Sequence, residues 1–465
     1  MEKTADGKIP LITRDRSFYI SLITLAIPVA LQNLITFAVT FADNLMVSSL
    51  GDSAVSGVYM GGQLQTFLQM FSAGVEGAIL VLAAQYWGKG DKESIKRIIS
   101  IGIHFSLGFG ALLTAVCTVI PGPVISIFTR DPEVIEQGTV YLRIVCFSYI
   151  FFCVTQAFIA AMRSVEAANI GMIVSAISLV INIGLNYTLI FGKFGFPAMG
   201  VKGAAAATLV SRIAETAVIA VYVFRIDRKL CLKAGDLLKT DALLRKDFIR
   251  YGLPIIGGNV VWSVNLMCNS VILGRLNKSV IAAASVANNL NSLAYVSITG
   301  MASAVGIITG KTVGAGETEK MKEYARTTQL IFFCVGLLTG GTLALLRRPF
   351  ISLYSGITAE AAHYALQFCT VLSVTIIGTS YQMACLFGLV KSGGDISFVF
   401  KNDMIFVFGV VLPGAALALW LGAPAWLVFA LLKSDQILKC FVAVFKINSF
   451  NWMKNLTRDR TEETA

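Results

Sequence analysis

Long apolar stretches alternate with short polar ones along nearly the whole chain. A transmembrane helix needs about 20 consecutive, predominantly apolar residues. Twelve stretches satisfy this requirement, and several exceed it, which indicates tilted helices or helices that extend beyond the bilayer. The predicted helices are 17–48, 54–86, 95–120, 133–162, 166–191, 200–224, 251–276, 280–313, 323–346, 358–390, 396–421 and 424–448. The pattern therefore predicts an all-α membrane protein with twelve transmembrane helices.

The composition agrees with a protein surrounded by lipid. Of the 465 residues, 56% are hydrophobic and 14% are charged, whereas a soluble domain carries about 25% charged residues. The net charge of +11 does not indicate a nucleic-acid partner, because the charges lie in short segments between apolar stretches rather than on one continuous face. We expect the lipid bilayer as a partner and no nucleic acid.

The distribution of basic residues predicts the orientation in the membrane. Most of the 38 lysines and arginines fall in segments on one side of the predicted spans: the N-terminus, alternate loops, a polar segment at 225–250 and the tail. Short basic loops stay in the cytoplasm. We therefore expect a multi-pass protein of the cell membrane with both termini in the cytoplasm, and its first apolar run to be an uncleaved span.

The two halves of the chain repeat each other at a shift of 226 positions. The shift aligns polar residues and Gly/Pro positions over about 100 residues without a gap, for example Pro28 with Pro254, Asn33 with Asn259 and Gly88 with Gly314. Each half has six predicted helices, an even number, so both insert in the same orientation and the substrate site is expected between them near the midplane. The predicted domains are an N-terminal lobe at 1–224, a cytoplasmic linker at 225–250, a C-terminal lobe at 251–448 and a cytoplasmic tail at 449–465.

Several polar residues interrupt the apolar helices. Asp43 lies inside the first predicted helix, where a charge costs about 2.5–3.5 kcal/mol. Two interpretations are open: Asp43 binds the coupling ion, or it lies at the end of the helix and faces water. Asn182 and Asn186 are four positions apart and share one face of their helix. Their amides either help to bind the ion or form hydrogen bonds between helices. Glu76 lies deep in the second helix. Three interpretations are open: it faces a water-filled pocket on the cytoplasmic side, it is a second proton site, or it is a counter-charge for a cationic substrate.

Other ionisable residues suggest structural roles. Arg212 and Glu215 are three positions apart and are predicted to form an ion pair along one helix face. His104 and His363 have no Cys or His neighbour at ligand spacing, and the nine cysteines contain no CxxC pair, so we expect no metal site and no disulfide framework.

The sequence resembles the multidrug and toxic compound extrusion (MATE) transporters over nearly its whole length. The resemblance rests on AIPVALQNLITFAVTFADNLMVSSLG, AAQYWGKGD and NIGLNYTLIFGKFGFPAMGVKGAAAATLVSR, with the second-half echoes GLP and KSGGD. It implies two six-helix lobes around a central cleft and a cation-coupled exporter of organic cations or amphipathic drugs, which we expect to be a monomer. It also implies H⁺ or Na⁺ as the coupling ion and no other cofactor.

The resemblance assigns roles to particular residues. Asp43 matches the family's coupling carboxylate, and Asn182 and Asn186 match two positions that surround it. Some proton-coupled members have an acid at the second of these positions, whereas this chain has Asn186, which leaves Asp43 as the only acid of the three. The C-terminal positions that carry acids in sodium-coupled members are Trp262 and approximately Ser380, and Asn269 is the repeat partner of Asp43, so coupling is expected in the N-terminal lobe.

The remaining cleft candidates are amides, an acid and aromatic side chains. Aromatic faces attract organic cations by about 0.5–2 kcal/mol each. Many aromatic residues in such a protein face lipid or neighbouring helices instead. The candidates for substrate contacts are Asn33, Gln63, Glu76, Asn259, Trp262 and Tyr295.

Three other functions compete with that of an antiporter that works by alternating access. A flippase for lipid-linked or amphiphilic substrates of the same superfamily is the alternative, but it needs several cavity cations, and the first-half helices contain only Arg143 and Arg212. A membrane enzyme needs a buried catalytic pair, and a channel needs a filter sequence or pore-lining repeats; the sequence has neither pattern. We therefore expect no catalytic residues and no enzymatic activity.

Overall fold

The computed structural model describes residues 10–128, 131–276, 278–352 and 358–458. The first nine residues of the predicted N-terminal lobe and the last seven of the predicted tail lie outside this range. Helices make up nearly all of the described chain, which confirms the all-α prediction, and the one extended pairing within the described residues is an isolated bridge between Gly394 and Met453.

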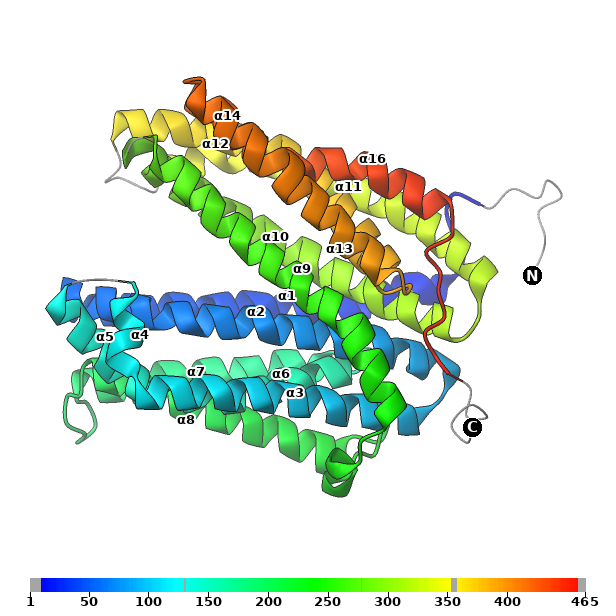
Figure 1. The fold of residues 1–465 in the computed structure, drawn as a ribbon, viewed down its shortest axis with the longest axis horizontal. Coiled ribbons are helices and arrows are strands. Elements are labelled where there is room, and N and C mark those ends of the chain that lie inside the picture. The colour runs from blue at the N-terminus through cyan, green and yellow to red at the C-terminus, as the bar shows by residue number, and fades with distance from the viewer. Residues whose placement is uncertain (1–9, 129–130, 277, 353–357, 459–465) are drawn as a thin grey trace. The chain divides into compact units, whose positions relative to one another are not determined.

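The helices follow the predicted apolar stretches closely (Figure 1). In the first half they are α1 (Arg16–Ser48), α2 (Asp52–Lys89), α3 (Lys92–Val119), α4 (Pro121–Ser126), α5 (Pro132–Val145), α6 (Ser148–Ser164), α7 (Asn169–Phe191), α8 (Val201–Val221), η1 (Tyr222–Ile226) and η2 (Ala234–Leu238). In the second half they are α9 (Ala242–Gly274), α10 (Lys278–Gly314), α11 (Thr318–Ser352), α12 (Ala359–Gln382), η3 (Met383–Lys391), α13 (Ile396–Met404), η4 (Ile405–Val411), α14 (Leu412–Trp420), α15 (Ala425–Leu432) and α16 (Asp435–Asn448).

Two predicted spans are not single straight helices. Within the described residues, ten helices are long and apolar enough to cross a membrane, and the pair α5 and α6, bent by 52°, makes an eleventh. The predicted helix at 424–448 is divided at Lys433–Ser434 into α15 and α16, each too short to span alone. The chain is therefore a multi-pass membrane protein, and the count of twelve stays a prediction.

The packing divides the chain into two compact units. One, here the N-terminal unit, comprises Leu31–Ala83 and Asp91–Ile256; the other, the C-terminal unit, comprises Met1–Ala30, Ala84–Gly90 and Gly257–Ala465. Helices α1, α2 and α9 each continue from one unit into the other. The units thus differ from the predicted lobes: the chain up to Ala30 and the segment Ala84–Gly90 belong to the C-terminal unit, and the predicted 225–250 linker belongs to the N-terminal unit.

Repeat-related glycines explain why the end of α2 belongs to the C-terminal unit. A Cβ atom at Gly88 would lie 1.9 Å from the carbonyl oxygen of Lys311, and one at Gly314 would lie 1.9 Å from the carbonyl oxygen of Gln85. The ends of α2 and α10 therefore cross with their backbones in contact, which any larger residue would prevent. The glycines that the repeat aligns are thus the contact points of this helix crossing.

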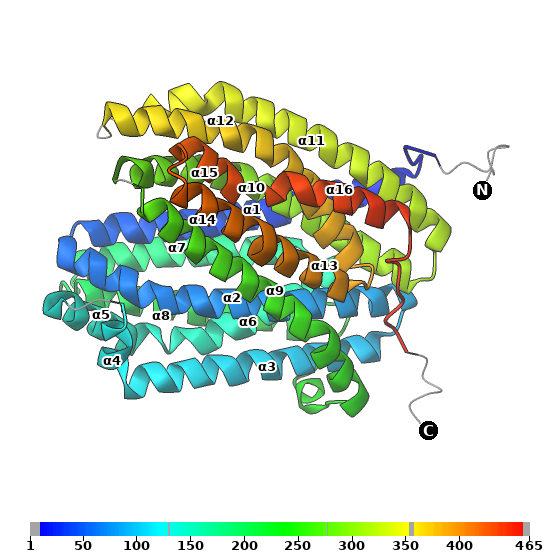
Figure 2. The ribbon, with the colours of Figure 1, turned by 45° about the horizontal axis from the view of Figure 1, so that its top comes forward.

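In the N-terminal unit, α3 packs on α6, and α8 packs on α5, α6 and α7 (Figure 1). In the C-terminal unit, α12 packs on α10, α11 and α16 (Figure 2). Each unit has its own buried apolar core, which includes Leu142 and Tyr149 in the first unit and Phe368 and Phe429 in the second. Each unit is thus a helical bundle of its own.

The predicted linker is partly helical. Asp241 caps the N-terminus of α9 by accepting hydrogen bonds from the backbone N–H groups of Leu243 (2.7 Å) and Leu244 (3.1 Å), and it pairs with Arg97 at 2.9 Å. A side-chain oxygen at the N-cap satisfies donors that have no partner inside the helix. Helix α9 therefore begins at Ala242, and the last nine residues of the predicted 225–250 linker belong to it.

The first part of the predicted tail packs in the C-terminal unit. Trp452 is fully buried, and its indole N–H donates to the carbonyl of Ile447 at 3.0 Å. The side chain of Gln85 donates to the carbonyl of Ser392 (3.1 Å) and accepts from the N–H of Leu456 (2.7 Å). This segment is therefore an ordered part of the fold.

Candidate functional site

Helices α1 and α7 bring the three predicted coupling residues together. One N–H of the Asn186 amide donates to a carboxylate oxygen of Asp43. The same amide nitrogen donates to Oδ1 of Asn182 at 3.2 Å. Asn182 and Asn186 are 2% and 1% exposed, and Asp43 is half-buried. The predicted shared face of α7 is confirmed, and it is turned toward Asp43.

Aromatic and basic side chains of the same unit surround this cluster. Arg212 on α8 interacts electrostatically with Asp43 while it binds Glu215 at 2.6 Å, which confirms the predicted ion pair. The guanidinium also lies 5.1 Å from the ring centre of Phe152. Tyr141 on α5 is buried close enough to interact electrostatically with Asp43. Since Arg212 and Glu215 neutralise each other, the cluster retains the single negative charge of Asp43.

The cluster has unused capacity to accept a proton or cation. Oδ1 of Asn186 is buried and has no hydrogen-bond partner among the described residues, although buried polar atoms are normally paired. Asp43 can take up a proton and become a donor, or its carboxylate can bind a cation together with amide oxygens, since hard cations prefer oxygen ligands. Chemically, the site is suited to H⁺ or Na⁺.

Glu76 lies apart from this cluster and has a protein cation as its electrostatic neighbour. That cation is Arg163, in the last turn of α6, whose Nη2 donates to Oε1 of Gln32 at 2.7 Å. Arg163 is a half-buried helical residue. Sequence spacing gave no signal for this pairing, because Glu76 and Arg163 lie on different helices.

The predicted substrate contacts fall in both units. Asn33, Gln63 and Glu76 lie in the N-terminal unit, whereas Asn259, Trp262 and Tyr295 lie in the C-terminal unit, and all six are half-buried. The hydroxyl of Tyr295 donates to the sulfur of Met383 at 3.5 Å. Their role in binding substrate stays a prediction.

The C-terminal unit contains charged residues that the sequence reasoning missed. Lys439 on α16 lies 2.8 Å from Asp403 on α13 and 3.2 Å from Asp435. Asp435 and Lys439 are four positions apart on one helix, a spacing that is typical of an ion pair along a helix face. Of the positions named from the repeat and the resemblance, Ser380 donates to the carbonyl of Phe332 at 2.9 Å.

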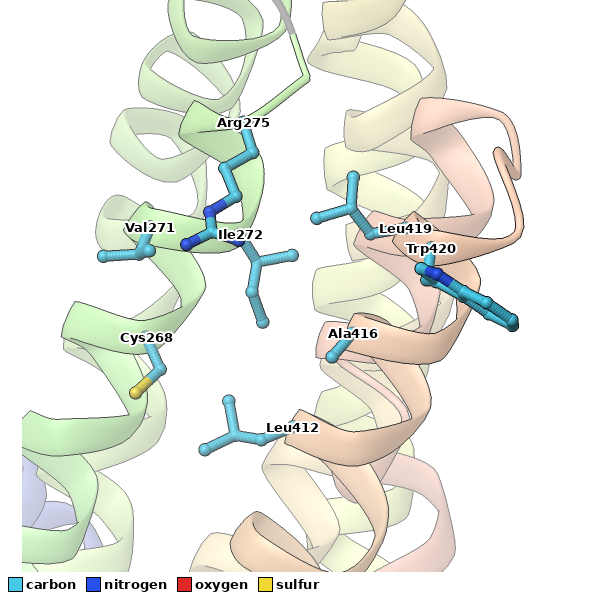
Figure 3. Close-up of a pocket in the computed structure, with 8 residues that line it drawn as sticks. All are labelled: Cys268, Val271, Ile272, Arg275, Leu412, Ala416, Leu419 and Trp420. Atoms are coloured by element: carbon cyan, nitrogen blue, oxygen red, sulfur yellow. The ribbon is translucent and has the colours of Figure 1, made fainter.

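An apolar cavity of about 590 Å³ also lies in the C-terminal unit (Figure 3). In Figure 3 the side chains of α9 face those of α14 across it, with Arg275 near one end. None of the predicted site residues lines this cavity; its lining residues are Cys268, Val271, Ile272, Arg275, Leu412, Ala416, Leu419 and Trp420.

The MatE family matches residues 28–188 and 254–417, most of both halves of the chain. The chain belongs to this family. MATE proteins are transporters, so the protein is a membrane transporter and not an enzyme.

Curated relatives and solved structures agree with this assignment. A probable multidrug resistance protein NorM from Thermotoga maritima is 26% identical over 72% of each chain. A probable multidrug resistance protein YoeA from Bacillus subtilis is 24% identical over 91% of this MATE chain and 94% of its own. A crystal structure of a MATE protein in a bent conformation superposes with a TM-score of 0.84 at 18% identity, over 98% of this chain and all of the other. At that identity the superposition shows the fold alone.

Proposed function

We propose that this MATE protein exports organic cations and amphipathic drugs in exchange for protons or sodium ions. The observation that carries the proposal is the hydrogen-bonded cluster of Asp43, Asn182 and Asn186, a lone carboxylate held by amides inside apolar helices. An acid at that depth is costly and is typically kept for ion transport. The names of the relatives, multidrug resistance proteins, support drugs as the substrate class.

In this proposal the ion and the drug act on one conformational equilibrium. An antiporter requires that the two ligands stabilise opposite states, so that each favours release of the other. Binding of H⁺ or Na⁺ at Asp43 neutralises its charge and changes its hydrogen bond with Asn186. The free energy available is roughly 2.3 kcal/mol per charge across 100 mV, which supports about fortyfold accumulation of substrate.

The proposed framework is the one that the repeat and the charge distribution predict. The lobes at 1–224 and 251–448 alternate access of the substrate site to the two sides of the cell membrane. The linker and both termini are in the cytoplasm. The transporter works as a monomer.

The test compares Asp43→Asn with Asp43→Glu in proteoliposomes. Asp43→Asn keeps the size and polarity of the side chain but removes its charge, and removing a buried charge leaves no unmatched partner in the amide cluster. We expect the variant to fold and to bind ethidium, used as the probe, while ethidium efflux driven by a proton or sodium gradient collapses. Asp43→Glu, which keeps a carboxylate, is the matched control and should retain part of the driven efflux.

The outcomes separate the alternatives. Near-normal driven efflux by Asp43→Asn would exclude Asp43 as the coupling residue. A wild-type protein that moves fluorescent phospholipid between leaflets, but not ethidium, would instead support a flippase. Imposing the proton and sodium gradients separately identifies the coupling ion.

A further inference from the structure

The cavity between α9 and α14 combines apolar walls with a single charged side chain. Its volume of about 590 Å³ is typical of ligand sites, which have about 300–1,000 Å³. Of the eight described residues that line it, Arg275 is the only charged one. Val271 on one wall and Trp420 on the other are 58% and 81% exposed, so the cavity is open to the surroundings of the protein.

The charged end of the cavity lies at the surface of the bilayer. Arg275 and Trp420 line the same end (Figure 3). The apolar helix Ala242–Gly274 ends directly before Arg275, and the span Ile396–Trp420 ends at Trp420. Tryptophan is enriched at the level of the lipid headgroups, and arginines near the ends of spans direct their charge to the same level. A ligand bound to Arg275 therefore has its charged group among the headgroups.

From this end the cavity runs toward the interior of the bilayer. Cys268 and Leu412 line its other end (Figure 3). They precede Arg275 and Trp420 by seven and eight positions, which corresponds to roughly 10–12 Å along a helix axis. One leaflet of the hydrocarbon core is about 15 Å thick. The apolar walls therefore lie at the depth of an acyl chain.

The guanidinium of Arg275 is available to a ligand. Arg275 is exposed, and among the described residues it has no hydrogen-bond or ion-pair partner. Arg212 in the N-terminal unit, by contrast, is paired with Glu215 at 2.6 Å. A guanidinium binds phosphate through parallel hydrogen bonds, and basic pockets between transmembrane helices bind the headgroups of anionic lipids. The donors of Arg275 thus match a phosphate group.

We propose that the cavity between α9 and α14 binds one anionic phospholipid of the surrounding membrane. Its phosphate binds Arg275, and part of one acyl chain packs between the apolar side chains of the two helices. A zwitterionic phospholipid binds more weakly, because its own ammonium group competes with Arg275 for the phosphate. A cationic drug is repelled by Arg275 and meets no carboxylate among the described lining residues.

The natural thiol of Cys268, at the inner end of the cavity, reports its occupancy. The full chain in detergent is alkylated with N-ethylmaleimide with and without phosphatidylglycerol, and modification of Cys268 is followed by peptide mass spectrometry. At about ten times the wild-type Kd, which native mass spectrometry provides, the lipid should slow this alkylation about elevenfold, because only the unoccupied fraction reacts. Alkylation of Cys334, an exposed thiol on α11, is the internal control and should not change.

Three variants separate a lipid site from general attraction of anions. Arg275→Gln removes the charge-assisted hydrogen bonds, so binding should weaken about tenfold and protection of Cys268 should fall to about twofold. Ala416→Phe keeps Arg275 but fills the cavity, and it should also lose protection. Arg348→Gln removes an exposed arginine of the same unit that does not line the cavity, and it should retain full protection.

The outcomes that would overturn the inference are specific. Equal protection of Cys268 in the wild type and in Arg275→Gln would show that the arginine binds no headgroup. Equal protection by phosphatidylcholine with the same acyl chains would show that the cavity does not select anionic lipids. Protection by ethidium and not by phosphatidylglycerol would identify a drug pocket instead. None of these results depends on whether the protein performs antiport, so the two proposals fail separately.

Discussion

The side-chain amide of Asn186 donates a hydrogen bond to Asp43, which lies 143 positions earlier in the chain. Its other N–H donates to Asn182, so both amide hydrogens are used. This arrangement fixes the orientation of the one carboxylate in the cluster. Asn186 is therefore a positioning residue for Asp43, and its replacement tests the site independently of charge.

Asn186→Leu should destabilise the protein and weaken coupling together. The substitution leaves the carboxylate of Asp43 and the amide oxygen of Asn182 without their donor, and a buried unpaired acceptor costs about 1–3 kcal/mol. Thermal unfolding in detergent should show a lower Tm, and gradient-driven efflux should fall more than ethidium binding does. Val180→Ala, an exposed position of the same helix, is the control, and equal results for both variants would show that Asn186 has no positioning role.

Glu76→Gln should lower stability without changing selectivity for charge. Glu76 is the electrostatic partner of half-buried Arg163, so its removal leaves a cation unmatched inside the protein. The double variant Glu76→Gln/Arg163→Gln should recover stability. Export of a cationic and a neutral substrate, compared per folded protein, should fall equally or not at all. A selective loss of the cationic substrate would instead identify Glu76 as a substrate counter-charge.

Asp395 should make stability depend on pH in the acid range. Asp395 lies in the loop between η3 and α13, where burial alone would raise its pKa, but hydrogen bonds from Lys446 and Lys454 outweigh burial and hold the pKa below the usual 3.8. A depressed folded-state pKa adds stability above the unfolded-state pKa, and this is lost as pH falls through the folded value. Asp395→Asn should therefore lower Tm at pH 7, and the difference from wild type should shrink below about pH 4.

The control for Asp395 is Glu319→Gln, an exposed acid, which should lower Tm little at any pH. Thermal unfolding scans of both variants at several pH values provide the measurement. A difference between Asp395→Asn and the wild type that stays constant down to pH 3.5 would contradict the assigned ion pairs.

The natural thiol of Cys231 reports the orientation of the chain. Cys231 is exposed and lies in the predicted cytoplasmic linker. A membrane-impermeant maleimide should label it in inverted vesicles and not in intact cells, and the signal should disappear in Cys231→Ser. Efficient labelling of Cys231 from outside intact cells would overturn the predicted orientation and with it the helix count.

The sequence predicted those features that depend on short segments of the chain. A bilayer requires that backbone groups pair within each spanning segment, so apolar stretches of sufficient length become helices wherever they pack. Helical periodicity also predicts neighbours within one helix, and the Asn182–Asn186 and Arg212–Glu215 contacts confirm this. The MATE motifs predicted the family, which the match over both halves confirms.

Tertiary structure alone decided which helix faces meet. Helical periodicity predicts on which face of its helix Glu76 or Lys439 lies, but not which residue that face meets. Glu76 meets Arg163, 87 positions away, and Lys439 meets Asp403, 36 positions away. Likewise, the apolar pattern did not predict the bend between α5 and α6, the break before α16 or the burial of Trp452. The physical reason is that burial of a charged or bulky group is stabilised by its partners across a helix interface, and the identity of those partners is fixed only when the bundle packs.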